Sequence, residues 1–468
     1  MSCSLRDQAA CTACRVALAY AIGDVLAGRV ELNTPLHSLI SIREGLFWKQ
    51  VGRSPYTASV FQGPPLLLQL CQLTAKHLVW QAIILSLVDW ITSCVLERVV
   101  THAVRLSKQD NAEHTYIKQS AQFLYLVNPF LILSTASGST ANLANLAVIA
   151  ALYGGLSSNT ALAGLGLATG CYLSAHPALL IVPTALLLLE QDRNLDKTAP
   201  PAISSHGSLP ADKHKLQQPD MPLLHQRVAK PVLSRNKPHI VLQLLSYTAL
   251  FTLGLLVLSD MQLRHYPEHF TTSLFKTRVQ GATPLPLGTQ SPVHWTRHVY
   301  GYMLMGPDST PNIGMWWYFF AEVFPSWRCP MKALFGIATV LPPLLLTIKL
   351  HKQPLLLFAC QCIVTSMLKP YPTAADAAQF MALLPLFPEL LLQLPSRVFT
   401  ATSLLLLAYL GPTMWYLWMD LGTGNANFFY AITLLWAAWQ AMLLLQMVTI
   451  ATHIDTADTP VQSKHKPV

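Results

Sequence analysis

The sequence predicts an all-α polytopic membrane protein with about twelve transmembrane helices of about 20 apolar residues each. Two observations predict this class. Apolar residues make up 52% of the 468 residues and charged residues only 11%, so the chain cannot cover its apolar content with a water-soluble surface. The Lys and Arg residues behind the net charge of +9 lie in short loops between apolar runs. That distribution is typical of topology determinants rather than of nucleic-acid binding.

Apolar runs that approach the length of a membrane span recur along the whole chain. Gly or Pro interrupts many of them, as at Asn128-Pro129 and Pro342-Pro343. Irregular backbone at membrane depth is tolerated only where protein or a wet cavity covers it, so we expect the bundle to enclose something polar. The runs occupy residues 10–28, 78–96, 117–135, 140–157, 159–175, 176–190, 239–260, 331–350, 353–368, 374–392, 399–418 and 427–450.

The distribution of Lys and Arg predicts which side of the membrane each loop faces. An even number of spans places both termini on one side, and the excess of basic residues on that side predicts that it is cytosolic. The loop between the two membrane halves is rich in Pro, Ser, His and Lys and is predicted to be disordered. The predicted organisation is an N-terminal membrane half, this loop, a C-terminal membrane half and a cytosolic tail, at residues 1–190, 191–238, 239–450 and 451–468.

Two large segments, residues 29–77 and 261–330, face the opposite, lumenal side in this topology. Both contain amphipathic helical material. The other connections on that side have only a few residues, so we expect the function to reside in these two segments.

The segment Asp308–Phe324 is the most informative part of the second lumenal loop. It reads D-S-T-P-N-I-G-M-W-W-Y-F-F-A-E-V-F. Pro311 suits the first turn of a helix, with Asp308, Ser309 and Thr310 as capping candidates. Trp and Tyr often anchor helices at a membrane interface, but five consecutive rings exceed what anchoring one helix needs. We therefore interpret them as a surface for a lipid tail or a partner; the rings are Trp316, Trp317, Tyr318, Phe319 and Phe320.

Glu322 is the carboxylate of this aromatic segment. A charged group among rings at a membrane boundary is costly unless it is paired. Glu322 therefore either binds a backbone donor, an Arg or a ligand amine, or reaches interfacial water. The sequence leaves both interpretations open.

A polar turn separates the last two predicted spans. The amides of Asn425 and Asn427 both donate and accept, which suits a hydroxyl-rich glycan or a phosphate, and Gly422 and Gly424 allow close approach of the backbone. The alternative is a tight turn in which Asn427 caps the last helix. A second lumenal turn, K-P-Y-P-T from Lys369, is followed by Asp376.

Several short motifs of the chain resemble those of the PIG-U family, whose members are a membrane subunit of the glycosylphosphatidylinositol (GPI) transamidase. The motifs are T-P-N-I-G from Thr310, W-Y-F-F-A-E from Trp317, K-P-Y-P-T from Lys369 and G-x-x-N-x-N-F-F-Y-A-I-T from Gly422. The resemblance covers most of the chain in order and leaves out loop 191–238 and the extreme termini.

The resemblance implies a non-catalytic subunit of an endoplasmic reticulum complex that attaches GPI to protein carboxyl termini. Catalysis would lie in a separate PIG-K subunit, and the further partners would be the PIG-T, PIG-S and GPAA subunits. This chain would bind or orient the GPI lipid. The residues expected to do so are Pro311, Asn312, Trp316, Trp317, Phe319, Phe320, Glu322, Asn425, Asn427, Phe428 and Phe429, with Tyr371 and Asp376 from the second turn.

The first lumenal segment supports a related fold and an enzymatic alternative. Its motifs E-G, S-P-Y and P-L-L lie between Arg43 and Leu68. They resemble the first loop of polyprenol-sugar-dependent mannosyltransferases of the GT-C membrane fold. This resemblance implies a GT-C-like bundle. Those enzymes use an acidic residue or pair as general base or metal ligand. Here Glu31 and Glu44 are the nearest carboxylates, and neither belongs to an acidic pair. We prefer a retained scaffold that has lost its catalytic acid.

Other functional classes have weaker support. The sequence has no G-x-S-x-G, no H-E-x-x-H, no Walker loop and no Cys/His constellation, so we expect no metal and no cofactor. Asp89 and Glu389 would suit the ion path of a transporter, but helix packing explains them as well. Lys464 and Lys466 resemble a dilysine retrieval signal, which agrees with a multi-pass protein of the endoplasmic reticulum membrane.

Overall fold

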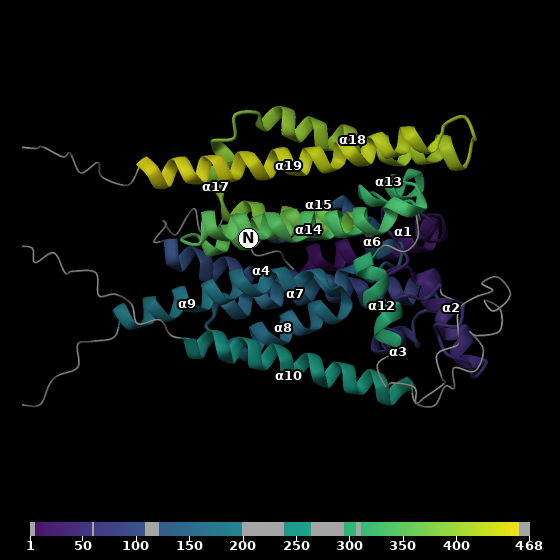
Figure 1. Cartoon of the computed structure of the whole chain (residues 1–468), viewed down its shortest axis with the longest axis horizontal. Helices are drawn as coiled ribbons and strands as arrows, with labels where there is room; N and C mark the ends of the chain where they lie inside the picture. Colours follow the sequence, from purple (N-terminus) through teal and green to yellow (C-terminus); the bar gives the residue numbers. More distant parts are fainter. Residues whose placement is uncertain are drawn as a thin grey trace, which may run out of the picture.

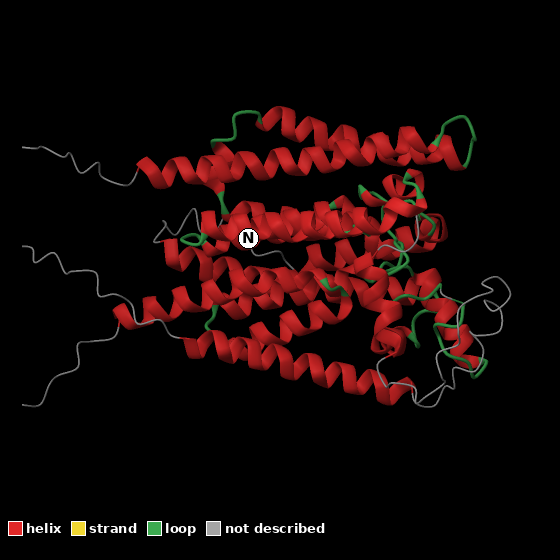
Figure 2. Ribbon diagram, viewed as in Figure 1, coloured by secondary structure: helices red, strands yellow, loops and turns green. Residues whose placement is uncertain are grey.

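The computed structural model describes residues 5–58, 60–107, 121–198, 238–263, 294–305 and 310–457. These ranges are helical with connecting loops and contain no strand (Figure 2). The helices are α1 (Leu5–Ala27), α2 (Leu39–Gln50), α3 (Pro65–Cys71), α4 (Leu78–Ser107), α6 (Pro129–Ala136), α7 (Ala141–Leu156), α8 (Thr160–Leu173), η1 (His176–Leu180), α9 (Ile181–Thr198), α10 (Pro238–Leu263), α12 (His294–Met305), α13 (Trp316–Glu322), α14 (Pro325–Leu350), α15 (Pro354–Leu368), α16 (Ala374–Leu383), η2 (Leu384–Leu386), α17 (Pro388–Leu392), α18 (Arg397–Met419) and α19 (Ala426–Ala457).

The long helices lie side by side in one bundle (Figure 1). The hairpin of α18 and α19 forms one side and packs on α15, while α10 lies on the opposite side against α8. Helices α2, α3, α12 and α13 gather at one end of the bundle, which we call the α13 end. The last turn of α9, the first turn of α10 and the last turn of α19 lie at the other end.

Six helices among the described residues are long and apolar enough to cross a membrane. They lie at Gln8–Ala27, Leu78–Val104, Pro238–Leu263, Pro325–Leu350, Arg397–Met419 and Ala426–Ile454, and each corresponds to a predicted span. The class of all-α membrane protein is thus confirmed. The count of about twelve spans is not, and the GT-C-like arrangement stays a prediction.

The other six predicted spans contain shorter or broken helices. Helices α7, α8 and α15 have 16, 14 and 15 residues, so each is about 21–24 Å long, which is less than the bilayer core of about 30 Å. Asn128 caps α6, with its Oδ1 accepting from the Phe130 N–H at 3.0 Å, and divides the run 117–135. The run 374–392 is divided into α16, η2 and α17.

Several predictions fall wholly or partly outside the described residues, among them the lumenal segment 261–330, which is described only at 261–263, 294–305 and 310–330. The loop at 191–238 is described only to residue 198 and at residue 238, and the tail only to residue 457. The capping candidates Asp308 and Ser309 also lie outside. Disorder of the loop stays a prediction, as does the division of the chain into two membrane halves.

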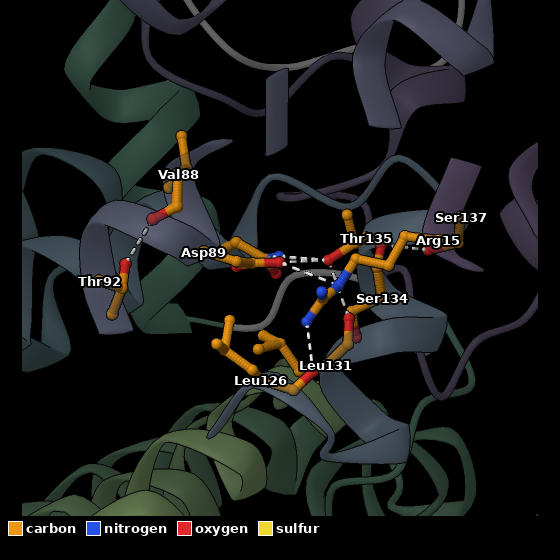
Figure 3. A network of polar contacts seen from close by, with 10 residues as sticks. Arg15, Val88, Asp89, Thr92, Leu126, Leu131, Ser134, Thr135 and Ser137 are labelled. Atoms are coloured by element: carbon orange, nitrogen blue, oxygen red, sulfur yellow. Dashed lines mark hydrogen bonds and ion pairs between the residues drawn. The ribbon is translucent and has the colours of Figure 1, made fainter. Parts of the chain in front are cut away.

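A buried ion pair and its hydrogen bonds join α1, α4, α6 and α7 (Figure 3). Arg15 of α1 faces Asp89 of α4, with 3.6 Å between Nε and Oδ2, and their side chains are 1% and 0% exposed. Thr135 of α6 and Asn142 of α7 donate to the Asp89 carboxylate at 2.6 and 2.9 Å, and Arg15 donates to the Leu126 carbonyl at 2.6 Å. Asp89 is therefore held within the chain itself.

We predict that Arg15 and Asp89 depend on each other for stability. Arg15→Met leaves an unpaired buried carboxylate and should destabilise the fold by about 3–5 kcal/mol. The double variant Arg15→Met/Asp89→Asn should recover most of this loss, because the Asn amide retains partners in Thr135 and Asn142. Unfolding midpoints of the purified chain in detergent measure both effects. A double variant as unstable as Arg15→Met would contradict the prediction.

Candidate functional site

The aromatic helix and the start of the last helix, which are far apart in sequence, meet at the α13 end. Trp317 of α13 lies 6.0 Å from Trp418 of α18 and 6.0 Å from Phe429 of α19, measured between ring centroids. Tyr318 lies 4.8 Å from Tyr430, whose hydroxyl donates to the Met315 carbonyl at 3.1 Å. We call this set the aromatic cluster; it comprises Trp317, Tyr318, Trp415, Trp418, Phe429 and Tyr430.

The remaining rings of α13 face a different neighbour. Trp316, Phe319 and Phe320 lie 4.8, 5.0 and 5.3 Å from Phe335 of α14. The Trp316 indole donates to the Leu368 carbonyl at 2.8 Å. Residues three and four apart share one face of a helix, so α13 is wedged between α14 on this face and the α18–α19 hairpin on the other. These three predicted residues position α13.

A mostly apolar cavity of about 670 Å³ lies beside the aromatic cluster. The end of α1, α6, α18 and α19 form most of its wall. Two predicted motifs contribute to it, through Phe429 and through Ile313 of T-P-N-I-G. The lining residues are Val25, Leu26, Arg29, Glu31, Leu32, Phe130, Leu133, Ile313, Ala374, Leu407, Ala408, Tyr409, Gly411, Pro412, Thr413, Tyr416, Phe429, Ile432, Thr433 and Trp436.

One ion pair belongs to this wall. The Arg29 Nη2 and Nε atoms donate to the Glu31 carboxylate at 3.0 and 3.3 Å. Nη2 also donates to the carbonyl of Pro412 in α18 at 3.0 Å. Arg29 and Glu31 are the only charged residues among those that line the cavity. The sequence pattern predicted only a role in topology for Arg29, although a charged residue just after a span is typical of the membrane interface.

The loop before α13 uses its asparagine internally. Asn312 is 1% exposed; its amide donates to the Thr310 carbonyl at 3.1 Å and accepts from the Gly314 N–H at 2.7 Å. Pro311 is partly buried beside it. Both residues shape the loop that carries Ile313 to the cavity. Glu322 ends α13 and is exposed, with Tyr318 as a contact.

The polar turn between α18 and α19 remains accessible. Asn425 caps α19, since its Oδ1 accepts from the Phe428 N–H at 3.2 Å, so the suggestion that Asn427 is the capping residue was wrong. Asn427 contacts Tyr318 instead. Asn425, Asn427 and Phe428 are exposed. Gly422 has a φ of +65°, which explains a glycine at this position.

The K-P-Y-P-T turn at residues 369–373 is buried. The Lys369 ammonium lies 2.6 Å from the Asp376 carboxylate, which also accepts from the Thr373 N–H at 2.7 Å. Tyr371 stacks on Tyr302 of α12 at 4.8 Å. The Ala374 N–H donates to the Glu31 carbonyl at 2.9 Å, so this turn positions the segment that carries Glu31.

The two carboxylates considered as sugar-transfer bases both have partners. Glu31 is paired with Arg29, and Glu44 accepts from the Trp48 indole at 2.7 Å within α2. Within the described part of the chain, no three or more His, Cys, Asp and Glu side chains group so that they could hold a metal ion.

Comparison with known proteins identifies the family. A family model described as GPI transamidase subunit PIG-U matches residues 9–436. The chain belongs to the PIG-U family. The match includes every residue that lines the cavity, up to Trp436.

Relatives of this PIG-U family member are named as components of a GPI transamidase. The GPI-anchor transamidase component PIGU of Homo sapiens is 27% identical over 90% of this chain and 87% of the human protein. The GPI transamidase component GAB1 of Saccharomyces cerevisiae is 28% identical over 95% of this chain and 94% of the yeast protein. The resemblance drawn from short motifs is therefore confirmed by a family match over residues 9–436.

We predict that protonation of His37 destabilises this PIG-U protein. Burial, aided by the positive charge of Lys369, lowers the pKa of His37 from 6.5 to about 4, against a smaller opposing effect of Asp376. Between pH 6.5 and 4 the unfolded chain binds a proton that the folded chain does not. This contribution to stability is complete above pH 6.5 and is lost as the pH falls towards 4, by up to about 1.4 kcal/mol per pH unit.

Unfolding midpoints at pH 7 and pH 5 test this prediction. The decrease between the two pH values should be smaller in His37→Gln than in the unaltered chain. His351→Gln is the matched control, because His351 is exposed, and it should leave the decrease unchanged. Equal decreases in the unaltered chain and in His37→Gln would contradict the assignment.

Proposed function

We propose that this chain is a non-catalytic subunit of the GPI transamidase of the endoplasmic reticulum and that its cavity holds the acyl chains of the GPI lipid. The observation that carries the proposal is the cavity itself. Its volume of about 670 Å³ is in the range of ligand sites, about 300–1,000 Å³. Its wall is mostly apolar, which suits hydrocarbon chains better than a sugar or an ion.

The depth of the cavity also suits an acyl chain. On α18 it is lined from Leu407 to Tyr416, a helical distance of about 13 Å. One leaflet of the hydrocarbon core is about 15 Å deep, half of about 30 Å. Arg29 and Glu31 lie towards the Tyr416 end, because Val30 between them packs against the aromatic cluster. A lipid would thus enter the cavity with its tails towards the bilayer centre and its headgroup at the α13 end.

The predicted residues divide into two roles in this proposal. Exposed groups at the α13 end would contact the glycan or phosphates of GPI: Glu322, Asn425, Asn427 and Phe428. Phe429 would contact a tail directly, because it lines the cavity. The buried residues would position these groups through their packing; they are Pro311, Asn312, Trp316, Trp317, Phe319, Phe320, Tyr371 and Asp376.

The topology and partners follow from the same proposal. The α13 end would face the lumen and both termini the cytosol. The relatives carry names as components of a GPI transamidase, which supports assembly of this chain with the PIG-K, PIG-T, PIG-S and GPAA subunits. Peptide cleavage would take place on PIG-K, with this chain presenting the lipid.

A cavity-filling variant tests the proposal. Ala408 lines the cavity, so Ala408→Phe should exclude a tail and lower the GPI precursor that co-purifies with the complex by about tenfold, the effect of about 1.4 kcal/mol. Attachment of GPI to a reporter protein in cells that lack the native subunit should fall with it. Lipid mass spectrometry and surface staining of the reporter measure the two quantities.

Ala401→Phe is the matched control. Ala401 lies on the same helix, is exposed and is not part of the cavity wall. It should leave GPI retention and reporter staining unchanged, and both variants should still co-purify with PIG-K. Normal GPI retention by Ala408→Phe would refute the assignment of the cavity to acyl chains.

A further inference from the structure

We infer that Arg29 binds the phosphodiester of the lipid whose chains occupy the cavity, with Glu31 as the residue that positions its guanidinium. This inference rests on the proposed function and adds to it the polar contact that selects a lipid with a phosphodiester.

The position of Arg29 suits a lipid phosphate. The first span ends at Ala27, so Arg29 lies two residues beyond the apolar core, at the depth where lipid headgroups begin. Arg29 is also part of the cavity wall, alongside Val25 and Leu26 of the same span. A lipid with its tails in the cavity therefore brings its phosphate next to this guanidinium.

The hydrogen bonds of Arg29 leave one end of the guanidinium open. Nε and Nη2 donate to Glu31, and Nη2 also donates to Pro412. Nη1 has no hydrogen-bond partner among the described residues. A guanidinium has five N–H donors in a fixed plane and binds phosphate well. Glu31 and Pro412 thus hold one edge of the group while Nη1 remains available to a phosphate oxygen.

The exposure of the pair fits exchange with a ligand. The side chains of Arg29 and Glu31 are 17% and 12% exposed, so the pair is sheltered but reachable. Sheltering raises the strength of a charged contact relative to bulk water. Because Glu31 neutralises Arg29 when the cavity is empty, no unpaired charge is left at the membrane boundary. A phosphodiester shares Arg29 with Glu31 and adds charge-assisted hydrogen bonds.

The N–H donors of Arg29 that Glu31 and Pro412 leave open also decide the class of the ligand. The cavity wall has one cation, and it is next to one carboxylate. A lipid without a phosphate, such as diacylglycerol, gains only the apolar contacts. A phosphatidylinositol gains the Arg29 contact as well, and its inositol carries the headgroup towards the exposed turn at Asn425. The structure therefore assigns the site to a lipid with a phosphodiester rather than to one without a phosphate.

Two variants of opposite expected effect test the inference. The transamidase complex containing this chain is placed in phosphatidylcholine nanodiscs that hold equal amounts of phosphatidylinositol and diacylglycerol with the same acyl chains, and retained lipid is measured by mass spectrometry. The unaltered complex should retain phosphatidylinositol preferentially. Arg29→Gln should lower this preference about tenfold or more, the usual effect of losing a charged hydrogen bond, without changing diacylglycerol.

Glu31→Gln should keep or raise the preference, because it removes the carboxylate that competes for Arg29 while the amide oxygen still accepts a hydrogen bond. If Arg29 only ties the end of α1 to α18, both variants should instead lower the retention of phosphatidylinositol and diacylglycerol alike. That result would overturn the inference. An unchanged preference in Arg29→Gln would also overturn it.

The same experiment separates this inference from the proposed function. Ala408→Phe should lower retention of phosphatidylinositol and diacylglycerol together, because it acts on the tails. If it does so while Arg29→Gln has no effect, the acyl-chain site stands and the phosphate contact fails. If Ala408→Phe changes the retention of neither lipid, the proposed acyl-chain site itself is refuted.

Discussion

Burial of charge in an apolar interior is the constraint on which this bundle depends. Arg15 and Asp89 are almost fully buried, and either group without the other would be far more costly than the pair. Their contact therefore fixes α1 against α4, and the hydrogen bonds of Thr135 and Asn142 add α6 and α7. Since the end of α1 and residues of α6 form part of the cavity wall, the position of the candidate site follows from this interior pair.

The aromatic helix has a comparable role at the α13 end. A helix as short as α13, with seven residues, has little stability of its own. Its rings supply the missing stability by packing on two neighbours, with Trp316 on α14 and Trp317 on the α18–α19 hairpin. Burial of two tryptophans provides several kcal/mol of favourable transfer free energy, at about 25 cal/mol per Å². The hairpin is thereby held beside the rest of the bundle with the cavity between them.

Much of this organisation is readable from the sequence, and the exceptions have physical reasons. Long apolar runs predicted the six helices that can span a membrane, whereas hydropathy alone could not distinguish a span from a short buried helix such as α8. Trp317 and Phe429 were both predicted as site residues, but their contact depends on tertiary packing across 112 positions of sequence. Arg29 was missed as a site residue because a lone Arg after a span usually only sets topology. Its place in the cavity wall includes a hydrogen bond to the Pro412 carbonyl, which no local pattern connects to it.

Two ion pairs involve α1 or the residues just after it, and they differ in what they can do. They are Arg15–Asp89 and Arg29–Glu31. Arg15 and Asp89 are 1% and 0% exposed, so no ligand can reach them, and their contribution is to the position of helices. Arg29 and Glu31 are 17% and 12% exposed and form part of a cavity wall, so a new partner can approach without unfolding the bundle. The same chemistry is thus structural in the interior and available for recognition at the boundary. Exposure, rather than residue type, decides which role an ion pair can have, because a ligand can reach only a pair that is partly exposed.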